Sequence, residues 1–142
     1  MSYYGLIDAT KMTDARTALL CAQLHLRAAK RHLEKGFSAK AIVTLHDAVL
    51  FGMRYYVAQH KRCASLAKDI ELWDAARLFH VLAHEGVFDD IHAFNRFSLL
   101  VERALWQESY SFDTRATLAE VEMMLVKLGV VRSTMPPSQV NI

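Results

Sequence analysis

Apolar residues recur three and four positions apart along most of this chain, which is the spacing that places side chains on one face of an α-helix. The first such stripe consists of Met12, Ala15, Leu19, Ala22, Leu26, Ala29 and Leu33. It predicts a helix from about Asp14 to Lys35 with one buried face. We expect Thr13 to be its N-cap, and Gly36 stands where a left-handed residue commonly ends a helix.

The next segment carries two parallel apolar stripes, which predicts the central helix of the fold. This helix runs from Ser38, the expected N-cap, to about His60. Its stripes consist of Ile42, Leu45, Val49, Gly52 and Tyr56, and of Leu50, Met53 and Val57. The three-residue link 36–38 requires an antiparallel hairpin with the first helix. Glycine inside a helix costs about 1 kcal/mol relative to alanine, so Gly52 indicates a close helix contact in the bundle or in a dimer, or is simply tolerated.

Three more helices are predicted after a basic and polar connection at residues 60–65. The third runs from about Asp69 to Glu85 and the fourth from about Ile91 to Gln107, while Asp113 or Thr114 caps the fifth. Their expected buried residues are Leu72, Ala76, Phe79 and Ala83, then Phe94, Phe97, Val101, Ala104 and Leu105, and finally Leu118, Val121, Leu125 and Leu128.

These patterns predict an all-α, up-and-down bundle of four or five helices. We expect one domain over residues 1–131 and a short, flexible C-terminal tail over residues 132–142. The composition agrees with one helical domain, since 53% of the 142 residues are hydrophobic and both prolines fall near the C-terminus, at Pro136 and Pro137. A chain of this length buries enough apolar surface to fold without disulfides or metals.

The net charge and the cysteines limit which partners and which cellular location we expect. A net charge of +2 is too small to predict DNA binding, and RNA binding would need the charge to gather on one face. Cys21 and Cys63 have no metal-ligand spacing, which is typical of a reduced, cytoplasmic protein. The longest apolar run, at residues 48–53, is far shorter than a membrane span, so no membrane association is expected.

Two histidines are the only candidate metal ligands with a suitable spacing. His80 and His84 lie one helical turn apart and could chelate one ion. A complete site would need Glu85 or His92 as well, and no recognisable spacing supports that set. We therefore predict no metal and no cofactor, and the alternative to chelation is that both histidines pack against a neighbouring helix. The chain also lacks a phosphate-binding loop and a nucleophile elbow, so no standard enzyme class is indicated.

Two regions resemble HEPN domains. Residues 28–49 (AAKRHLEKGFSAKAIVTLHDAV) are similar to the first hairpin of that family, in which a basic helix ends in Leu-Glu-x-Gly. Residues 82–90 and 94–110 are similar to its third and fourth helices, and the resemblance extends from about Arg16 to Leu128. It implies a HEPN-like bundle that forms a homodimer.

In active members of that family, an arginine is followed four to six residues later by a histidine, often with a tyrosine two positions beyond, in a ribonuclease site shared across the dimer. The matching stretch here is Arg103-Ala-Leu-Trp-Gln-Glu108-Ser-Tyr110, with glutamate in the histidine position. A histidine would exchange protons with the RNA, whereas the carboxylate of Glu108 repels phosphate and titrates too low to donate a proton at neutral pH. The ribonuclease motif is therefore predicted to be lost.

Three functions remain open. The favoured one is a non-catalytic HEPN-like module that dimerises and binds a nucleotide, RNA or a protein partner, such as a nucleotidyltransferase of a toxin-antitoxin pair. Arg96 and Arg103, seven residues apart on one helical face, would contact the ligand together with Glu108 and Tyr110. The alternatives are a metal-independent ribonuclease with a displaced site at Arg77 and His84, and a purely structural helical adaptor.

Overall fold

A computed structural model of the protein describes residues 15–71, 73–106 and 112–132. These residues form six α-helices and no strands. The helices are α1 (Ala15–Glu34), α2 (Ser38–Gln59), α3 (Lys61–Leu66), α4 (Ala75–His84), α5 (Ala93–Trp106) and α6 (Thr114–Lys127). None of these helices combines the length and apolar character needed to cross a membrane.

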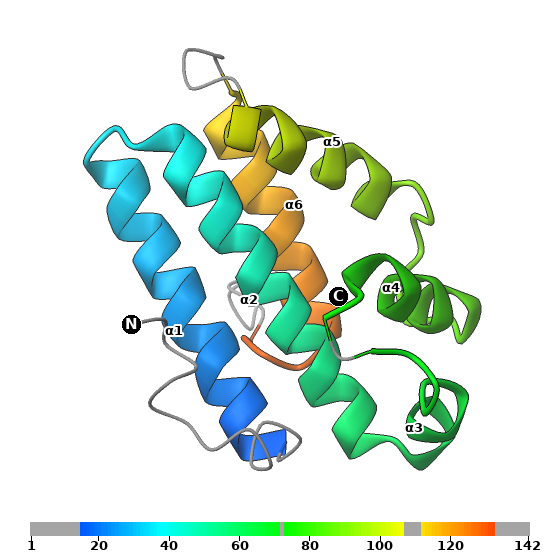
Figure 1. Ribbon diagram of the computed structural model, residues 1–142. Coiled ribbons are helices and arrows are strands. Elements are labelled where there is room, and N and C mark those ends of the chain that lie inside the picture. Colours follow the sequence, from blue (N-terminus) through cyan, green and yellow to red (C-terminus); the bar gives the residue numbers. More distant parts are fainter. Residues whose placement is uncertain (1–14, 72, 107–111, 133–142) are drawn as a thin grey trace, which may run out of the picture.

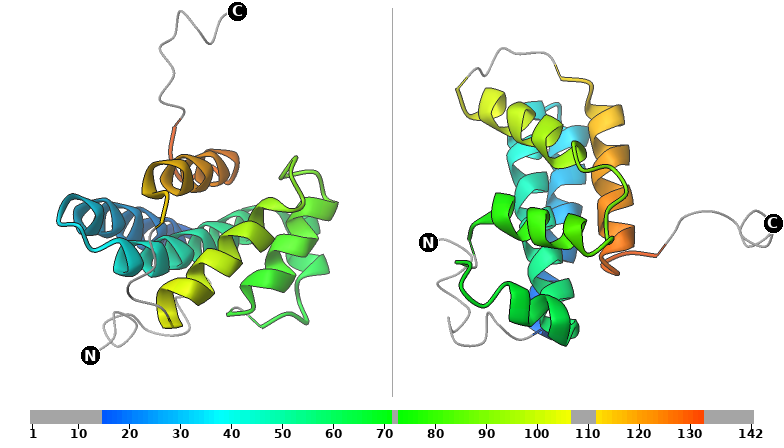
Figure 2. Two further views of the ribbon diagram at one scale, coloured as in Figure 1. Left: turned by 90° about the horizontal axis from the view of Figure 1, so that it is seen from above. Right: turned by 90° about the vertical axis from the view of Figure 1, so that its right-hand side faces the viewer.

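The long helices α1, α2 and α6 lie side by side, whereas α4 and α5 run across them (Figure 1). Seen from above, α6 packs on one side of α2, and α4 and α5 cross its other side (Figure 2). Helices α1 and α2 are antiparallel, as predicted, but α6 runs parallel to α2 (Figure 1), so the predicted up-and-down arrangement describes the α1–α2 hairpin and not the rest of the described helices. The all-α class is confirmed for the described residues.

Helix α2 is the centre of the fold, as its double stripe predicts. It contacts each of the other five helices, and ten of its residues are buried. Gly52 marks its closest approach to α6. A Cβ atom at this position would lie 3.1 Å from side-chain carbons of Leu125 and Leu128 and 3.2 Å from Val130. The close contact indicated by Gly52 is thus made inside the bundle.

The helix ends confirm some predicted caps and correct another. Gly36 has a φ of +81°, the left-handed conformation expected after α1. Asp113 caps α6, because its side chain accepts a hydrogen bond from the backbone N–H of Ala116. Ser38 was expected to cap α2 but is its first helical residue, and Phe37 occupies the cap position without a side-chain hydrogen bond. The expected cap Thr13 lies outside the described residues.

The segment between α2 and α4 differs most from the prediction. The expected polar connection contains a short helix, α3, whose Cys63 is buried. The third predicted helix begins at Ala75 rather than near Asp69, because the side chain of Asp74 accepts a hydrogen bond from the backbone N–H of Arg77 and starts the helix there. Leu72, expected in the core, lies outside the described residues.

The buried face of α4 also differs from the predicted one. Ala75, Leu78, Phe79 and Leu82 are buried, while Ala76, which was expected to be buried, is exposed. In α5, Leu105 is also exposed although its neighbours Val101 and Ala104 are buried as expected. The helices share one continuous hydrophobic core, in which Phe79 stacks on both Phe88 and Phe94.

Candidate functional site

The two arginines of the predicted ligand site lie at opposite ends of α5. Arg96 is in its first turn and Arg103 in its last turn, and both are exposed. Glu108 and Tyr110 lie outside the described residues, so the structure does not place the remainder of this predicted site.

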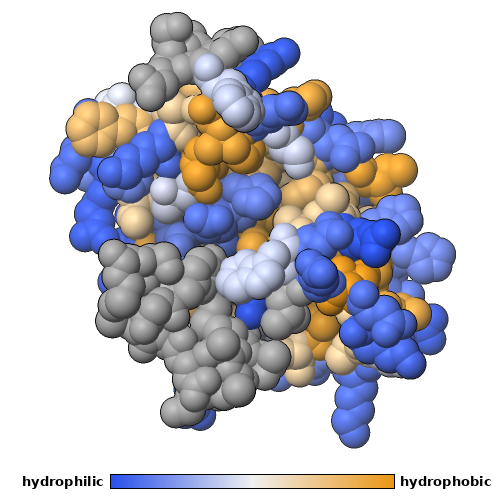
Figure 3. Space-filling view, in the orientation of Figure 1, coloured by the Kyte–Doolittle hydropathy of each residue, from blue (hydrophilic) through white to orange (hydrophobic). Residues whose placement is uncertain are grey.

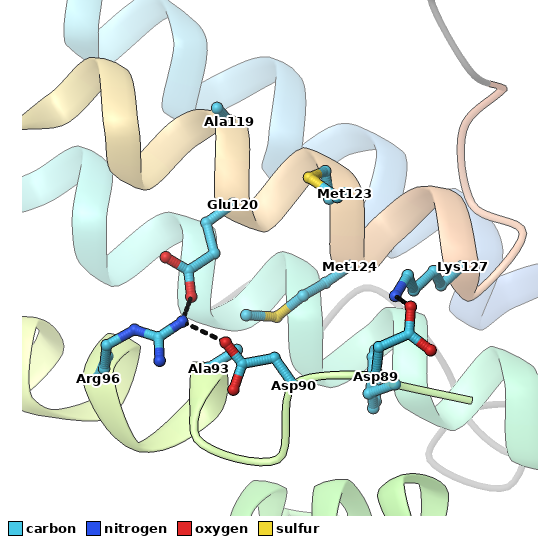
Figure 4. Close-up of a pocket in the computed structure, with 10 residues that line it drawn as sticks. Asp89, Asp90, Ala93, Arg96, Ala119, Glu120, Met123, Met124 and Lys127 are labelled. Carbon is cyan, nitrogen blue, oxygen red and sulfur yellow. Dashed lines mark hydrogen bonds and ion pairs between the residues drawn. The ribbon is translucent and has the colours of Figure 1, made fainter. Parts of the chain in front are cut away.

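Arg96 forms an ion pair with two carboxylates from different segments (Figure 4). Its Nη2 atom donates hydrogen bonds to Asp90 Oδ2 at 2.6 Å and to Glu120 Oε1 at 3.0 Å. The hydrogen bond from Arg96 lowers the pKa of Asp90, and the hydrogen bond to Asp90 raises the pKa of Arg96. Each partner thus stabilises the charged form of the other. The arginine expected to contact a phosphate already has two anionic neighbours.

These ion pairs border a hollow between α6 and the start of α5, which we call the α5–α6 hollow. Its volume is about 350 Å³, and its floor includes the buried side chains of Phe88, Ala93 and Met124. At its other end, Lys127 of α6 donates a hydrogen bond to Asp89 at 2.5 Å (Figure 4). The hollow is therefore apolar inside, with an ion pair at each end: Arg96–Glu120 joins α6 to the first turn of α5, and Lys127–Asp89 joins α6 to the segment before α5.

The charges lining the α5–α6 hollow do not favour an anionic ligand. Three carboxylates line it, those of Asp89, Asp90 and Glu120, against the two cations of Arg96 and Lys127. A phosphate entering the hollow would meet a net negative charge and would compete with existing ion pairs for Arg96. An apolar or mixed-charge protein surface fits this lining better than a nucleotide does.

The outer side of α6 continues this apolar surface. Its exposed face, which we call the α6 face, consists of Ala116, Ala119, Met123 and Val126. Met123 is 63% exposed, and both Met123 and Ala119 also line the α5–α6 hollow. No other described helix covers this side of α6 (Figure 2). The four residues follow a 3,4,3 spacing, so a second apolar stripe was visible in the sequence but was not used to predict a site.

The candidate metal ligands lie in a different place. His80, His84 and His92 line one hollow of about 540 Å³ between α4 and the start of α5. The fold thus brings His92 to the pair on α4. However, within the described ranges no group of three or more histidine, cysteine, aspartate or glutamate side chains is placed to hold a metal ion.

The alternative ribonuclease pair, Arg77 and His84, lies toward opposite ends of α4. Arg77 lies near the N-cap of that helix, where its Nε atom is 3.6 Å from a carboxylate oxygen of Asp74. His84 is the last residue of the same helix, about 10 Å farther along its axis. Arg77 does not line the hollow to which His84 belongs. The two side chains therefore do not line this hollow together.

Comparison with known proteins adds no assignment, because no family model, no curated protein and no solved structure matches this chain.

Proposed function

We propose that this protein is a non-catalytic, HEPN-like helical module that acts as a homodimer, with the two copies packing through the α6 face. The observation that carries the proposal is the apolar stripe on the exposed side of α6, which continues into the α5–α6 hollow. An exposed methionine beside an apolar hollow is typical of a protein-binding surface. The α1–α2 hairpin and the all-helical arrangement agree with the resemblance to HEPN domains.

A second copy of the chain is the partner that the shape of this face favours. Small residues occupy its N-terminal half and larger ones its C-terminal half. If two α6 helices pack antiparallel about a two-fold axis near Val121, Ala119 faces Met123 of the second copy and Ala116 faces Val126 of the second copy. Each large side chain then meets a small one, so the face is complementary to itself, as a two-fold interface requires.

The charges around α6 also favour a second copy of the chain as the partner. Both signs of charge border the α6 face, with Glu120 and Lys127 along one edge and Arg115 and Glu122 along the other. A mixed surface of this kind can be matched by a copy of itself. A nucleotide or RNA would require unpaired cations at Arg96, which instead contacts two carboxylates. We therefore propose a protein partner in preference to a nucleotide or RNA.

The size of the protein in solution tests this proposal. We expect light scattering after gel filtration to give twice the monomer mass of 16.1 kDa at concentrations of ~100 μM. Met123→Lys places an unpaired charge in the centre of the interface, and such a change typically costs about 2 kcal/mol or more of binding free energy. The dissociation constant of the dimer should therefore rise by about 30-fold or more.

Leu99→Lys is the matched control, because Leu99 is 56% exposed on α5 and does not belong to the α6 face. This variant should keep the native dimer mass. A native chain that is monomeric at ~100 μM would refute the proposal. Equal dissociation of the Met123 and Leu99 variants would also refute it, because the interface would then not be specific to α6.

A further inference from the structure

The hollow between α4 and the start of α5 has an unusual set of polar groups, and we call it the histidine hollow. His80 and His84 come from successive turns of α4, and His92 comes from the turn before α5. Among the described residues, these three imidazoles are its only titratable lining groups, and Asn95 supplies a neutral amide. The described lining therefore holds no permanently charged side chain, and a positive charge in it can come only from histidine.

Charged groups near the histidine hollow are engaged elsewhere. On α4, Arg77 pairs with Asp74. After α4, Glu85 pairs with Arg62 of α3. Neither pair lines the hollow, so neither supplies it with a fixed charge.

Before α5, Asp90 accepts a hydrogen bond from the backbone N–H of His92 at 2.9 Å, but its other oxygen is held by Arg96 in the α5–α6 hollow. On α2, the ring of His46 lies 6.2 Å from that of Phe94 and its Nδ1 atom lies 3.9 Å from Asp47. These groups surround the histidine hollow without lining it, so an entering anion meets imidazoles rather than carboxylates.

The floor of the histidine hollow is aromatic. Phe79 of α4 and Phe94 of α5 are 5% and 4% exposed, and their rings stack with centroids 5.0 Å apart. The volume of about 540 Å³ lies in the range of small-molecule sites, about 300–1,000 Å³. On the face that includes α4 and α5, hydrophilic residues alternate with small hydrophobic groups (Figure 3). A ligand here would find an apolar base and a rim that becomes cationic when the histidines are protonated.

We propose that the histidine hollow binds a small amphiphilic anion, whose carboxylate or phosphate group contacts the imidazoles of His80, His84 and His92 and whose apolar body rests on Phe79 and Phe94. This site is separate from the α6 face and does not depend on dimer formation. An imidazolium is the only cation that the described lining can offer to an anion, so we expect binding to strengthen as the pH falls.

Phenyl phosphate is a suitable probe, because it combines a phosphate with an apolar ring. The binding is measured from the NMR signals of the histidine Cε1–H groups in a buffer that contains a metal chelator. At pH 6 we expect saturable shifts of the signals from His80, His84 and His92, with a dissociation constant on the order of 1 mM. Inorganic phosphate and benzyl alcohol, which each lack one half of the probe, should bind at least about 10-fold more weakly.

The pH dependence separates this proposal from a site made of fixed cations. Phenyl phosphate gains negative charge between pH 6 and pH 8.5, since a phosphate monoester has a second pKa of about 6. A site made of lysines or arginines would therefore bind it at least as well at pH 8.5. The histidine hollow should bind it at least about 10-fold more weakly at that pH.

The double variant His80→Gln, His84→Gln should abolish the saturable shifts, because glutamine keeps a polar side chain but cannot become cationic. Both residues are exposed, so the fold should persist, and the unchanged signals of the other histidines would verify this. His32→Gln on α1 is the control and should bind as the native chain does.

The proposal fails if no saturable shift occurs up to ~20 mM phenyl phosphate at pH 6, or if binding is equally tight at pH 8.5. It also fails if the double variant binds like the native chain, or if inorganic phosphate alone binds as tightly as phenyl phosphate. None of these results depends on whether the protein is a dimer.

Discussion

At the scale of single residues, a glycine in α2 allows α6 to pack closely against that helix. Gly52 lies in the middle of α2, and the side chains of Leu125, Leu128 and Val130 fill the space where its Cβ would be. Because glycine is unfavourable inside a helix, the sequence left two interpretations open at Gly52, a close helix contact or simple tolerance. It could not indicate the neighbour, since that depends on how α6 returns to α2.

We expect Gly52→Val to lower the free energy of unfolding by about 1–3 kcal/mol, because the added methyl groups overpack a buried contact. Gly52→Ala should have a smaller effect, since the gain in helix propensity of about 1 kcal/mol offsets part of the crowding. Urea denaturation measures both changes. Ala58→Val on the exposed side of the same helix is the control. If the free energy of unfolding of Gly52→Val were no lower than that of the control, this result would contradict the close packing of α6 on α2.

The residues of the predicted ligand site show the limit of sequence reasoning at the same scale. The seven-residue spacing of Arg96 and Arg103 correctly places both at exposed positions of α5. It says nothing of Glu120, which lies 24 residues beyond Arg96 in the chain and pairs with it across the α5–α6 hollow. The charge state of a site depends on such long-range partners, and periodicity does not contain them.

At the scale of elements, the bounds of helices with a long apolar stripe were predicted within one or two residues. The segment between α2 and α4 has no such stripe, and its helix bounds were not predicted correctly. The bounds of α1 and α2 differ by only one residue from those predicted. The segment between α2 and α4 has short apolar runs, so the prediction missed α3 and started α4 too early. Asp74 was the usable signal there, because an aspartate before an apolar stripe is a strong N-cap.

The cap of α6 gives a test at this scale. Asp113 accepts a hydrogen bond from the backbone N–H of Ala116 at 3.0 Å. We expect Asp113→Ala to lower the free energy of unfolding by about 1 kcal/mol, because it leaves that N–H without its partner. Asp113→Asn should retain most of the stability, since asparagine caps almost equally well. Chemical denaturation would contradict this role if asparagine and alanine were equally destabilising.

At the scale of the whole molecule, α2 is enclosed by the other helices, and α6 is left with an apolar outer side. An all-helical fold with a central second helix follows from stripes in the sequence. The crossing of α4 and α5 does not, because crossing angles depend on how side chains of different helices interlock. Identifying the α6 face needs both the sequence and the structure. The sequence contains its apolar stripe, and the structure shows that this stripe is exposed.

The most direct measurement of the proposed dimer is a cross-link between copies at the α6 face. Chains carrying Ala119→Cys are mixed with chains carrying Met123→Cys and oxidised, and covalent dimers are separated by electrophoresis. A disulfide needs Cα atoms about 4.4–6.8 Å apart, so antiparallel packing about Val121 predicts efficient cross-linking in the mixture and little in either variant alone. The native Cys21 and Cys63 are buried and should contribute little. No covalent dimer in the mixture, or equal cross-linking of each variant with itself, would contradict the proposed interface.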